Sequence, residues 1–316
     1  MRTRELSRRV LVAGLIASGA ARNAASAERA GGVIDLMPGF WRVMDATPHG
    51  TPADWAQRIA NDYLRPNGVV FEAAGLGKIT PARIERWLGQ VEPLLPAIRK
   101  LDGDIDAIWS ANMQVFRKAF PAFDPKISPT YFMPSFFSFD AHLEPHRGVL
   151  PLFVGLDGIV RYHGAGANLA VLLSHELFHC EHAQRSPSVA LEDPERIYKV
   201  LWAEGLATYV SERMNPKASR LDVLLDGKRL DAQGDAYVPA MAKALSDSLD
   251  STASADYARF FSAGYEGAWP PRGGYLVGLL IARRLGRTRS LASLAALPAP
   301  QVRTLMAAEL ARLAKD

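Results

Sequence analysis

Residues 168–179 read Asn-Leu-Ala-Val-Leu-Leu-Ser-His-Glu-Leu-Phe-His, and this stretch decides how the chain is expected to fold. Leu169, Leu172 and Leu173 recur at helical spacing, with neither Gly nor Pro in the run. Asn168 precedes the run and can cap it, because its side chain accepts hydrogen bonds from backbone N–H groups. The stretch therefore predicts a helix that carries both histidines.

Two imidazoles and a carboxylate stand at fixed offsets on this helix. Residues four apart lie one turn apart on the same face, so His175 and His179 can bind one zinc ion together. Glu176 follows the first histidine directly and can reach a water molecule on that ion without being a ligand. This His-Glu-x-x-His pattern is a metallopeptidase signature, and Zn2+ is the expected cofactor. A helix whose histidines are merely hydrogen-bonded is the alternative.

A catalytic zinc site needs a third protein ligand and keeps its fourth position for water. His182 lies on the same helix about 10 Å further along the axis than His175, so it cannot bind the same ion. A metzincin would need Gly at position 182, and that class is therefore disfavoured. Glu204 is the expected ligand, because a carboxylate on an apolar helical stripe is costly to bury unless it is paired or binds metal. Three other carboxylates stay open as alternatives: Glu181, Glu192 and Asp193.

The helix that carries Glu204 is expected to open with Asp193 as its cap and Pro194 at its first position. Leu201 and Thr208 share a face with Glu204 on this helix. Metal-bound histidines usually donate their second ring hydrogen to a nearby acceptor, and Thr208 is the expected acceptor.

These two helices resemble those of the gluzincin metallopeptidases, especially the bacterial predicted zinc-dependent proteases. In those proteins His-Glu-x-x-His is followed by a helix bearing Glu-Gly-x-Ala, which Glu204, Gly205 and Ala207 match here. The resemblance covers roughly residues 165–213. It implies a zincin-like catalytic unit with a small β-sheet before the metal helix, a zinc site, and peptides or proteins as substrates.

The chain is thus predicted to be α+β and mostly helical, in three parts. Residues 1–27 form the expected export signal, 28–127 an N-terminal helical region, and 128–316 the zincin-like catalytic region with its C-terminal helices. Thr51-Pro52 and Thr80-Pro81 each place a capping side chain before a proline suited to the first helical turn. Helices are expected from these caps to about residues 64 and 91, and then at 97–120, 237–249, 257–263, 274–285 and 299–314.

Short apolar and aromatic runs broken by Pro and Gly predict strands at 131–133, 135–139 and 150–156. In gluzincins the edge strand of the sheet pairs with an extended substrate. Phe153-Val154-Gly155-Leu156 is the expected edge here, with an interior strand as the alternative.

One tyrosine flanked by glycines stands out in Arg272-Gly273-Gly274-Tyr275-Leu276-Val277-Gly278, at the start of an expected helix. The resemblance includes a Gly-Tyr helix of this kind. Tyr275 is the expected donor to the oxyanion of the tetrahedral intermediate, with Tyr265 and Arg272 as further candidates. The alternative is that the glycines pack this helix against a neighbour and Tyr275 only fills space.

The first 27 residues predict export. Four arginines open them, a short apolar run follows, and Ala25-Ser26-Ala27 fits a cleavage site. Arg8-Arg9 also resembles a twin-arginine signal, with an ordinary secretory signal as the alternative. We therefore expect a periplasmic or secreted protein without a stable membrane anchor once the signal is removed.

Charge and cysteine content exclude other classes. The chain has 37 basic and 33 acidic residues, and its first 27 residues hold five Arg and one Glu, which leaves 32 of each beyond them. A balanced chain lacks the basic face that nucleic acids require, so nucleic-acid binding is disfavoured. Cys180 is the only cysteine, which rules out an intramolecular disulfide, and it is expected to be a small buried apolar residue.

The predicted function is an exported zinc-dependent peptidase. His175, His179 and Glu204 are expected to hold zinc, and Glu176 to act as the general base for the attacking water and then as the proton donor to the leaving amine. Two alternatives stay open: a non-catalytic exported zinc-binding or structural protein, and a zinc hydrolase of non-peptide amides or cell-wall peptides. The glutamate beside His175 argues against the first, since structural zinc sites need no base and are usually closed by four protein ligands.

Overall fold

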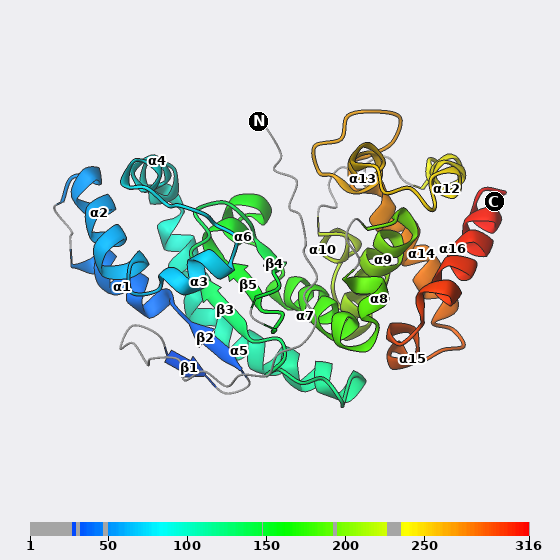
Figure 1. Ribbon diagram of the computed structural model, residues 1–316, viewed down its shortest axis with the longest axis horizontal. Coiled ribbons are helices and arrows are strands. Elements are labelled where there is room, and N and C mark those ends of the chain that lie inside the picture. Colours follow the sequence, from blue (N-terminus) through cyan, green and yellow to red (C-terminus); the bar gives the residue numbers. More distant parts are fainter. Residues whose placement is uncertain are drawn as a thin grey trace. The chain divides into compact units, whose positions relative to one another are not determined.

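The computed structural model describes residues 27–29, 32–46, 50–146, 148–191, 195–225 and 235–315. The expected export signal lies outside these residues except for its last position. The described chain is mostly helical and contains a small mixed sheet (Figure 1), which confirms the predicted α+β class. Among the described helices, none combines the length and the apolar character that crossing a bilayer requires.

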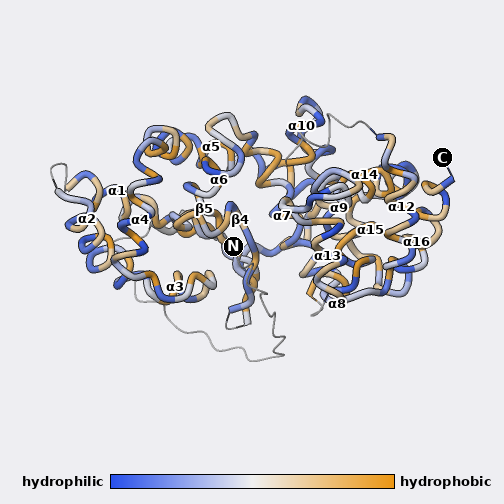
Figure 2. The backbone as a smooth tube through the Cα atoms, turned by 90° about the horizontal axis from the view of Figure 1, so that it is seen from above, coloured by the Kyte–Doolittle hydropathy of each residue, from blue (hydrophilic) through white to orange (hydrophobic). Residues whose placement is uncertain are grey.

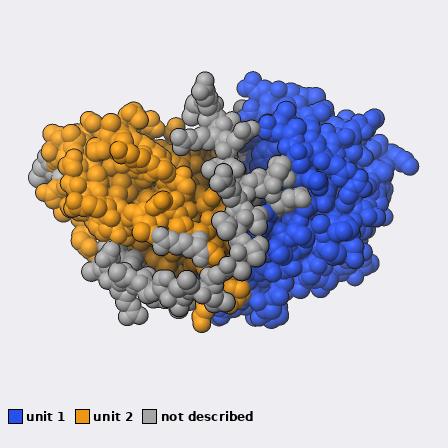
Figure 3. Space-filling view, viewed as in Figure 1, with its two compact units in different colours: residues 1–10, 108–123, 168–316 blue, residues 11–107, 124–167 orange. Residues whose placement is uncertain are grey.

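The described chain divides into two compact units, which Figure 3 colours separately. The sheet unit comprises the described residues up to 107 together with 124–167, and the helical unit comprises 108–123 and 168–315. Each unit therefore draws on residues from both sides of position 127, where we placed a boundary from the sequence. The helix with the two histidines belongs to the helical unit.

The sheet unit begins with two short strands that the sequence patterns did not predict. Thr51 and Thr80 cap its helices as expected, accepting hydrogen bonds from the backbone N–H groups of Asp54 at 3.2 Å and Arg83 at 3.3 Å. Its elements in chain order are β1 (Ala27–Arg29), β2 (Val33–Asp35), α1 (Met37–Asp45), α2 (Pro52–Arg58), η1 (Ile59–Leu64), α3 (Gly68–Ala73), α4 (Pro81–Val91), η2 (Glu92–Leu94), the first part of α5 (Leu95–Ala119), β3 (Thr130–Met133), β4 (Ala141–Leu143), β5 (Leu152–Gly155) and α6 (Leu156–His163).

The strands lie in the order β1-β2-β3-β5-β4. The pairs β2–β3 and β3–β5 are parallel, whereas β1 and β4 run antiparallel to their neighbours at the two edges. The expectation that residues 153–156 form an edge strand is therefore wrong, because β5 lies between β3 and β4. The burial of β5 agrees with an interior position in the sheet, since Leu152, Phe153 and Val154 are fully buried.

The strand predicted at 135–139 is also wrong, since this segment is a turn in which Phe136 and Phe137 have φ of 53° and 56°. The buried carboxylate of Asp157 explains the turn, because it accepts hydrogen bonds from the backbone N–H of Ser135 at 2.5 Å and of Phe137 at 2.9 Å. The side chain of Trp87 donates to the same carboxylate at 2.9 Å. The aromatic run thus reflects packing around Asp157 rather than strand pairing.

The helical unit contains all the remaining described helices. Four of them correspond to helices predicted after residue 236, with ends within three residues of the expected ones. Figure 2 shows hydrophilic and hydrophobic colours alternating along the helices, as expected for elements that bury one face. The elements are the second part of α5, α7 (Leu169–Arg185), α8 (Pro187–Ala190), α9 (Ile197–Met214), α10 (Arg220–Val223), α12 (Val238–Asp247), α13 (Ser254–Phe261), α14 (Gly273–Leu285), α15 (Leu291–Ala295) and α16 (Ala299–Leu313).

The start of α9 differs from the expectation. We placed its cap at Asp193 and its first residue at Pro194, which both lie outside the described residues, but α9 begins at Ile197. Arg196 has an extended backbone with φ of −77° and ψ of 145°, so the helical conformation starts only after it. The cap of α7 is as predicted, since Asn168 accepts a hydrogen bond from the backbone N–H of Val171.

Candidate metal centre

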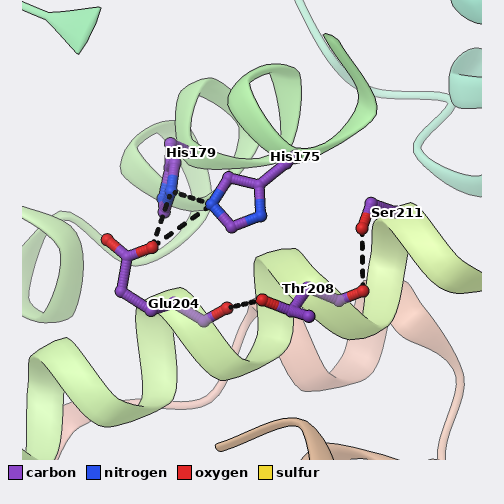
Figure 4. A network of polar contacts seen from close by, with 5 residues as sticks. All are labelled: His175, His179, Glu204, Thr208 and Ser211. Atoms are coloured by element: carbon purple, nitrogen blue, oxygen red, sulfur yellow. Dashed lines mark hydrogen bonds and ion pairs between the residues drawn. The ribbon is translucent and has the colours of Figure 1, made fainter. Parts of the chain in front are cut away.

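Helix α7 places its two predicted histidines side by side (Figure 4). The Nε2 atoms of His175 and His179 lie 3.1 Å apart, and their ring centroids lie 4.8 Å apart. The side chain of His175 is 2% exposed and that of His179 is 19% exposed. The two rings therefore present one nitrogen each to a common point that solvent can reach from the side of His179.

A network of hydrogen bonds next to His175 helps to fix α7 in position, and the sequence patterns did not predict it. The hydroxyl of Ser174 donates to the side-chain oxygen of Asn112 on α5 at 2.9 Å, and the amide of Asn215 donates to that hydroxyl at 3.0 Å. The amide of Asn112 also donates to the carbonyl of Ala170 at 2.7 Å. Residues distant in sequence thus hold the turn of α7 that precedes the first histidine.

Glu204 approaches both histidines from α9, as Figure 4 shows. Its Oε2 atom lies 3.2 Å from Nε2 of His175 and 3.5 Å from Nε2 of His179. One ligand atom from each of the three residues lies within 4.8 Å of the others, in a group that could hold a metal ion. The structure therefore brings together the three residues that we expected to be ligands.

The protonation states of this group suit a cation. Burial lowers the pKa of His175 to about 4, so its imidazole is neutral near pH 7 and offers a lone pair. Burial alone would raise the pKa of Glu204, but the adjacent His179 and His175 outweigh burial and hold this pKa well below its usual value. At neutral pH the group therefore offers the neutral imidazole of His175 and the carboxylate of Glu204.

Glu176 follows His175 on α7 and is partly exposed. It is not a member of the three-residue group that could hold a metal. Glu176 is thus adjacent in sequence to one member of that group without belonging to it.

Tyr275 lies next to the group, on the first turn of α14. Its ring is stacked at 22° to that of His175, with centroids 6.2 Å apart. Burial and the nearby charge of Glu204 raise the pKa of Tyr275 well above its usual value, so its phenol keeps its proton and can donate a hydrogen bond. Tyr265, a second candidate donor, has its own partners: it accepts from the backbone N–H of Ala268 at 3.3 Å and stacks on Trp269.

Two glycines bring Tyr275 and Glu204 together. A Cβ atom on Gly205 would lie 2.4 Å from the backbone of Gly278, and one on Gly278 would lie 2.6 Å from the backbone of Gly205. α9 and α14 therefore touch backbone to backbone at the residue after Glu204 and one turn after Tyr275. Gly278 therefore packs α14 against Gly205 of α9, which agrees with the alternative that the glycines serve helix packing. The same contact brings Tyr275 next to the group of His175, His179 and Glu204.

Replacing Gly278 by Ala is expected to lower the free energy of unfolding by about 1–3 kcal/mol, because the added methyl group must push two packed backbones apart. Gly89→Ala is the matched control, since Gly89 lies in the last turn of α4 and a Cβ atom there meets nothing within 4 Å. That control is expected to be more stable than the wild type by about 0.5–1 kcal/mol. Urea unfolding measures both, and equal stability of the two variants would contradict the close contact.

Thr208, the predicted acceptor for a histidine ring hydrogen, does not accept one from His175. The hydroxyl of Thr208 donates to the backbone carbonyl of Glu204 at 2.7 Å, within its own helix (Figure 4). Threonine in a helix commonly bonds to the carbonyl four residues earlier. Within the described part of the chain, Nδ1 of His175 is buried and has no hydrogen-bond partner.

Of the other carboxylates weighed from the sequence, Glu181 does not belong to the three-residue group. Glu181 is bound to Arg185 on the same helix, with 2.8 Å between Oε1 and Nε. Glu192 and Asp193 lie outside the described residues. His182 is also outside the ligand group, because α7 continues without a break to Arg185.

His182 is a buried histidine whose two ring nitrogens have no hydrogen-bond partner among the described residues. Its ring stacks on Phe178 at 5.3 Å, and burial lowers its pKa to about 3. A histidine in an unfolded chain has a pKa of about 6.5. Below that pH the unfolded chain therefore binds a proton that the folded chain does not.

His182→Leu is accordingly expected to reduce the loss of stability on acidification. In the wild type this residue lowers the free energy of unfolding by about 2 kcal/mol at pH 5, and by nothing above about pH 7. Urea unfolding of the metal-free wild type and variant between pH 8 and pH 5 measures the difference. Identical pH dependence of the two proteins would show that His182 does not stay neutral in the fold.

Comparison with known proteins finds no matching family model, no matching curated protein and no matching solved structure. The resemblance to gluzincins therefore rests on the motif residues of α7 and α9. What this centre can do follows from its geometry and from the chemistry of its side chains.

Proposed function

We propose that this protein is an exported zinc-dependent peptidase of the gluzincin type. The observation that carries the proposal is the close meeting of one nitrogen from His175, one from His179 and one oxygen from Glu204. Export is supported by the basic, apolar and small-residue order of the first 27 residues. A zincin-like catalytic unit belongs to the same proposal and is supported by a small sheet that precedes α7 in the sequence.

The ligand atoms fit zinc. Zinc binds histidine nitrogen at about 2.0–2.1 Å and carboxylate oxygen at about 2.0–2.2 Å in tetrahedral geometry, so two of its ligands lie about 3.3–3.5 Å apart. The three separations here are 3.1, 3.2 and 3.5 Å. Two imidazoles and one carboxylate also form the donor set of catalytic sites, which leave a fourth position for water.

The residues around the centre supply the remaining chemistry of amide hydrolysis. When bound, zinc would lower the pKa of a coordinated water to about 7 and polarise the scissile carbonyl. Glu176 takes the proton from the attacking water and delivers it to the leaving amine. Tyr275 donates its phenol hydrogen to the oxygen that gains negative charge, because burial keeps that phenol protonated.

Metal analysis combined with a peptide-library cleavage assay tests the proposal on the full chain. We expect about one zinc per chain, cleavage by the zinc-loaded protein, loss of cleavage with a chelator, and recovery when zinc is restored. Bound zinc without cleavage of any peptide would overturn the peptidase and favour a non-catalytic zinc protein. Hydrolysis of small amides or cell-wall peptides alone would shift the substrate class.

A further inference from the structure

The ring of His175 lacks the hydrogen bond that usually orients a metal-bound histidine. Such histidines donate the hydrogen of their second ring nitrogen to a nearby acceptor, which fixes the ring. Among the residues that the structure describes, Nδ1 of His175 has no hydrogen-bond partner. The ring is stacked against Tyr275, which in turn lies 4.1 Å from the guanidinium carbon of Arg272. Its place relative to Glu204 therefore depends on the turn of α7 that carries it.

Asn112 on α5 holds this turn of α7 at two points. Its side-chain nitrogen donates to the carbonyl of Ala170 at 2.7 Å, and its side-chain oxygen lies 2.9 Å from the hydroxyl of Ser174. The single hydrogen of that hydroxyl can go to Asn112 or, at 2.7 Å, to the carbonyl of Ala170. Both side chains are buried, and hydrogen bonds are stronger away from water. Since Ser174 directly precedes His175, these bonds fix the backbone that carries the first histidine.

The same hydroxyl connects α7 to the helix that carries Glu204. Asn215 is the C-cap residue of α9, and its side-chain nitrogen donates to Oγ of Ser174 at 3.0 Å. This nitrogen also lies 2.8 Å from the carbonyl oxygen of Ser211, in the last turn of α9. Helix α9 continues without a break from Ile197 to Met214 and includes Glu204. Ser174 therefore joins the helix of the two histidines to the helix of the glutamate.

We propose that Ser174 is a positioning residue, whose hydroxyl fixes α7 against α9 so that His175 and Glu204 lie at metal-binding separations before a metal binds. This inference rests on the zinc site of the proposed function, but not on the cleavage of peptides. Ligands that are already in place lose less conformational freedom when the metal binds. Loss of the hydroxyl therefore weakens metal binding although no ligand is removed.

Ser174→Ala removes the hydroxyl and keeps all three expected ligands. We expect its Kd for zinc, measured on the full chain by competition with a chromophoric chelator, to rise about 10- to 100-fold, as is typical when groups behind metal ligands are replaced. Ser186→Ala is the matched control, because Ser186 at the other end of α7 is 5% exposed and donates to the carbonyl of Leu297 at 2.9 Å. This control is expected to lower the stability of the metal-free protein in urea and to keep the wild-type Kd for zinc.

Asn215→Ala tests the same connection at a partly exposed residue, and it replaces Ser174→Ala if that variant does not fold. It removes the donor to Ser174, so the Kd for zinc is expected to rise here too, by a smaller factor. Because the two residues share a hydrogen bond, the double variant is expected to raise the Kd by less than the product of the two single effects.

A wild-type Kd for zinc in Ser174→Ala or in Asn215→Ala would overturn the positioning role. An equal rise in Ser186→Ala would also overturn it, since the effect would then follow general stability. Absence of zinc binding by the wild type would overturn both this role and the proposed function. Bound zinc without cleavage of any peptide would overturn the peptidase alone, because the competition assay needs no substrate.

Discussion

Glu176→Gln is expected to abolish peptide hydrolysis while leaving about one zinc bound per chain. The substitution keeps the shape of the side chain and removes its ability to accept a proton from water. A positioned general base contributes about 100- to 10,000-fold to a rate, so kcat should fall by at least the lower of these factors. Zinc content is expected to stay unchanged because Glu176 lies outside the group of His175, His179 and Glu204.

Glu181→Gln is the matched control on the same helix. Glu181 is buried against Arg185, away from the ligand group, so its variant is expected to keep both zinc and kcat. Hydrolysis and zinc content should be measured on the same preparations, with circular dichroism to verify the helical content. An unchanged kcat in Glu176→Gln would remove this residue from the role of base, and loss of zinc would make it a ligand.

Glu204→Ala is expected to remove the bound metal. Without this carboxylate only His175 and His179 remain of the three ligands, and two imidazoles cannot complete a catalytic zinc site. Zinc per chain should fall from about one to near zero after dialysis, and hydrolysis should be lost with it. The rise in stability that zinc gives the wild type, about 2.7 kcal/mol at a free concentration of 100 times its Kd, should be absent.

Glu212→Ala controls for the loss of a glutamate from the same helix. Glu212 pairs with Arg283 on α14 and lies two turns beyond Glu204, so this variant is expected to bind zinc like the wild type. Thermal unfolding with and without added zinc compares the three proteins. If Glu204→Ala retains one zinc per chain, the third ligand lies elsewhere, and Glu192 and Asp193 become the first positions to replace.

The patterns that sequence analysis interpreted well are local ones. The helical run after Asn168, the caps at Thr51 and Thr80 and the helices of the C-terminal region depend on side chains within one or two turns of each other. The pairing of His175 with His179 is local in the same sense, because helix geometry alone places residues four apart on one face.

Features that depend on distant residues were missed or misjudged. The aromatic run around Phe136 predicts a strand, but the carboxylate of Asp157, about 20 residues further along the chain, accepts hydrogen bonds from two of its backbone N–H groups and stabilises a turn. The strand at 152–155 became an interior one because β4 pairs with it on one side and β3 on the other.

The candidate metal centre combines a local feature with one that depends on distant residues. Local spacing on α7 was enough to predict that two histidines share a face, because a helix imposes that arrangement without help from the rest of the chain. The approach of Glu204 and Tyr275 needed the contact of Gly205 with Gly278, where two helices far apart in sequence meet without side chains between them. Such a contact depends on the packing of the entire helical unit, and no spacing within one segment encodes it.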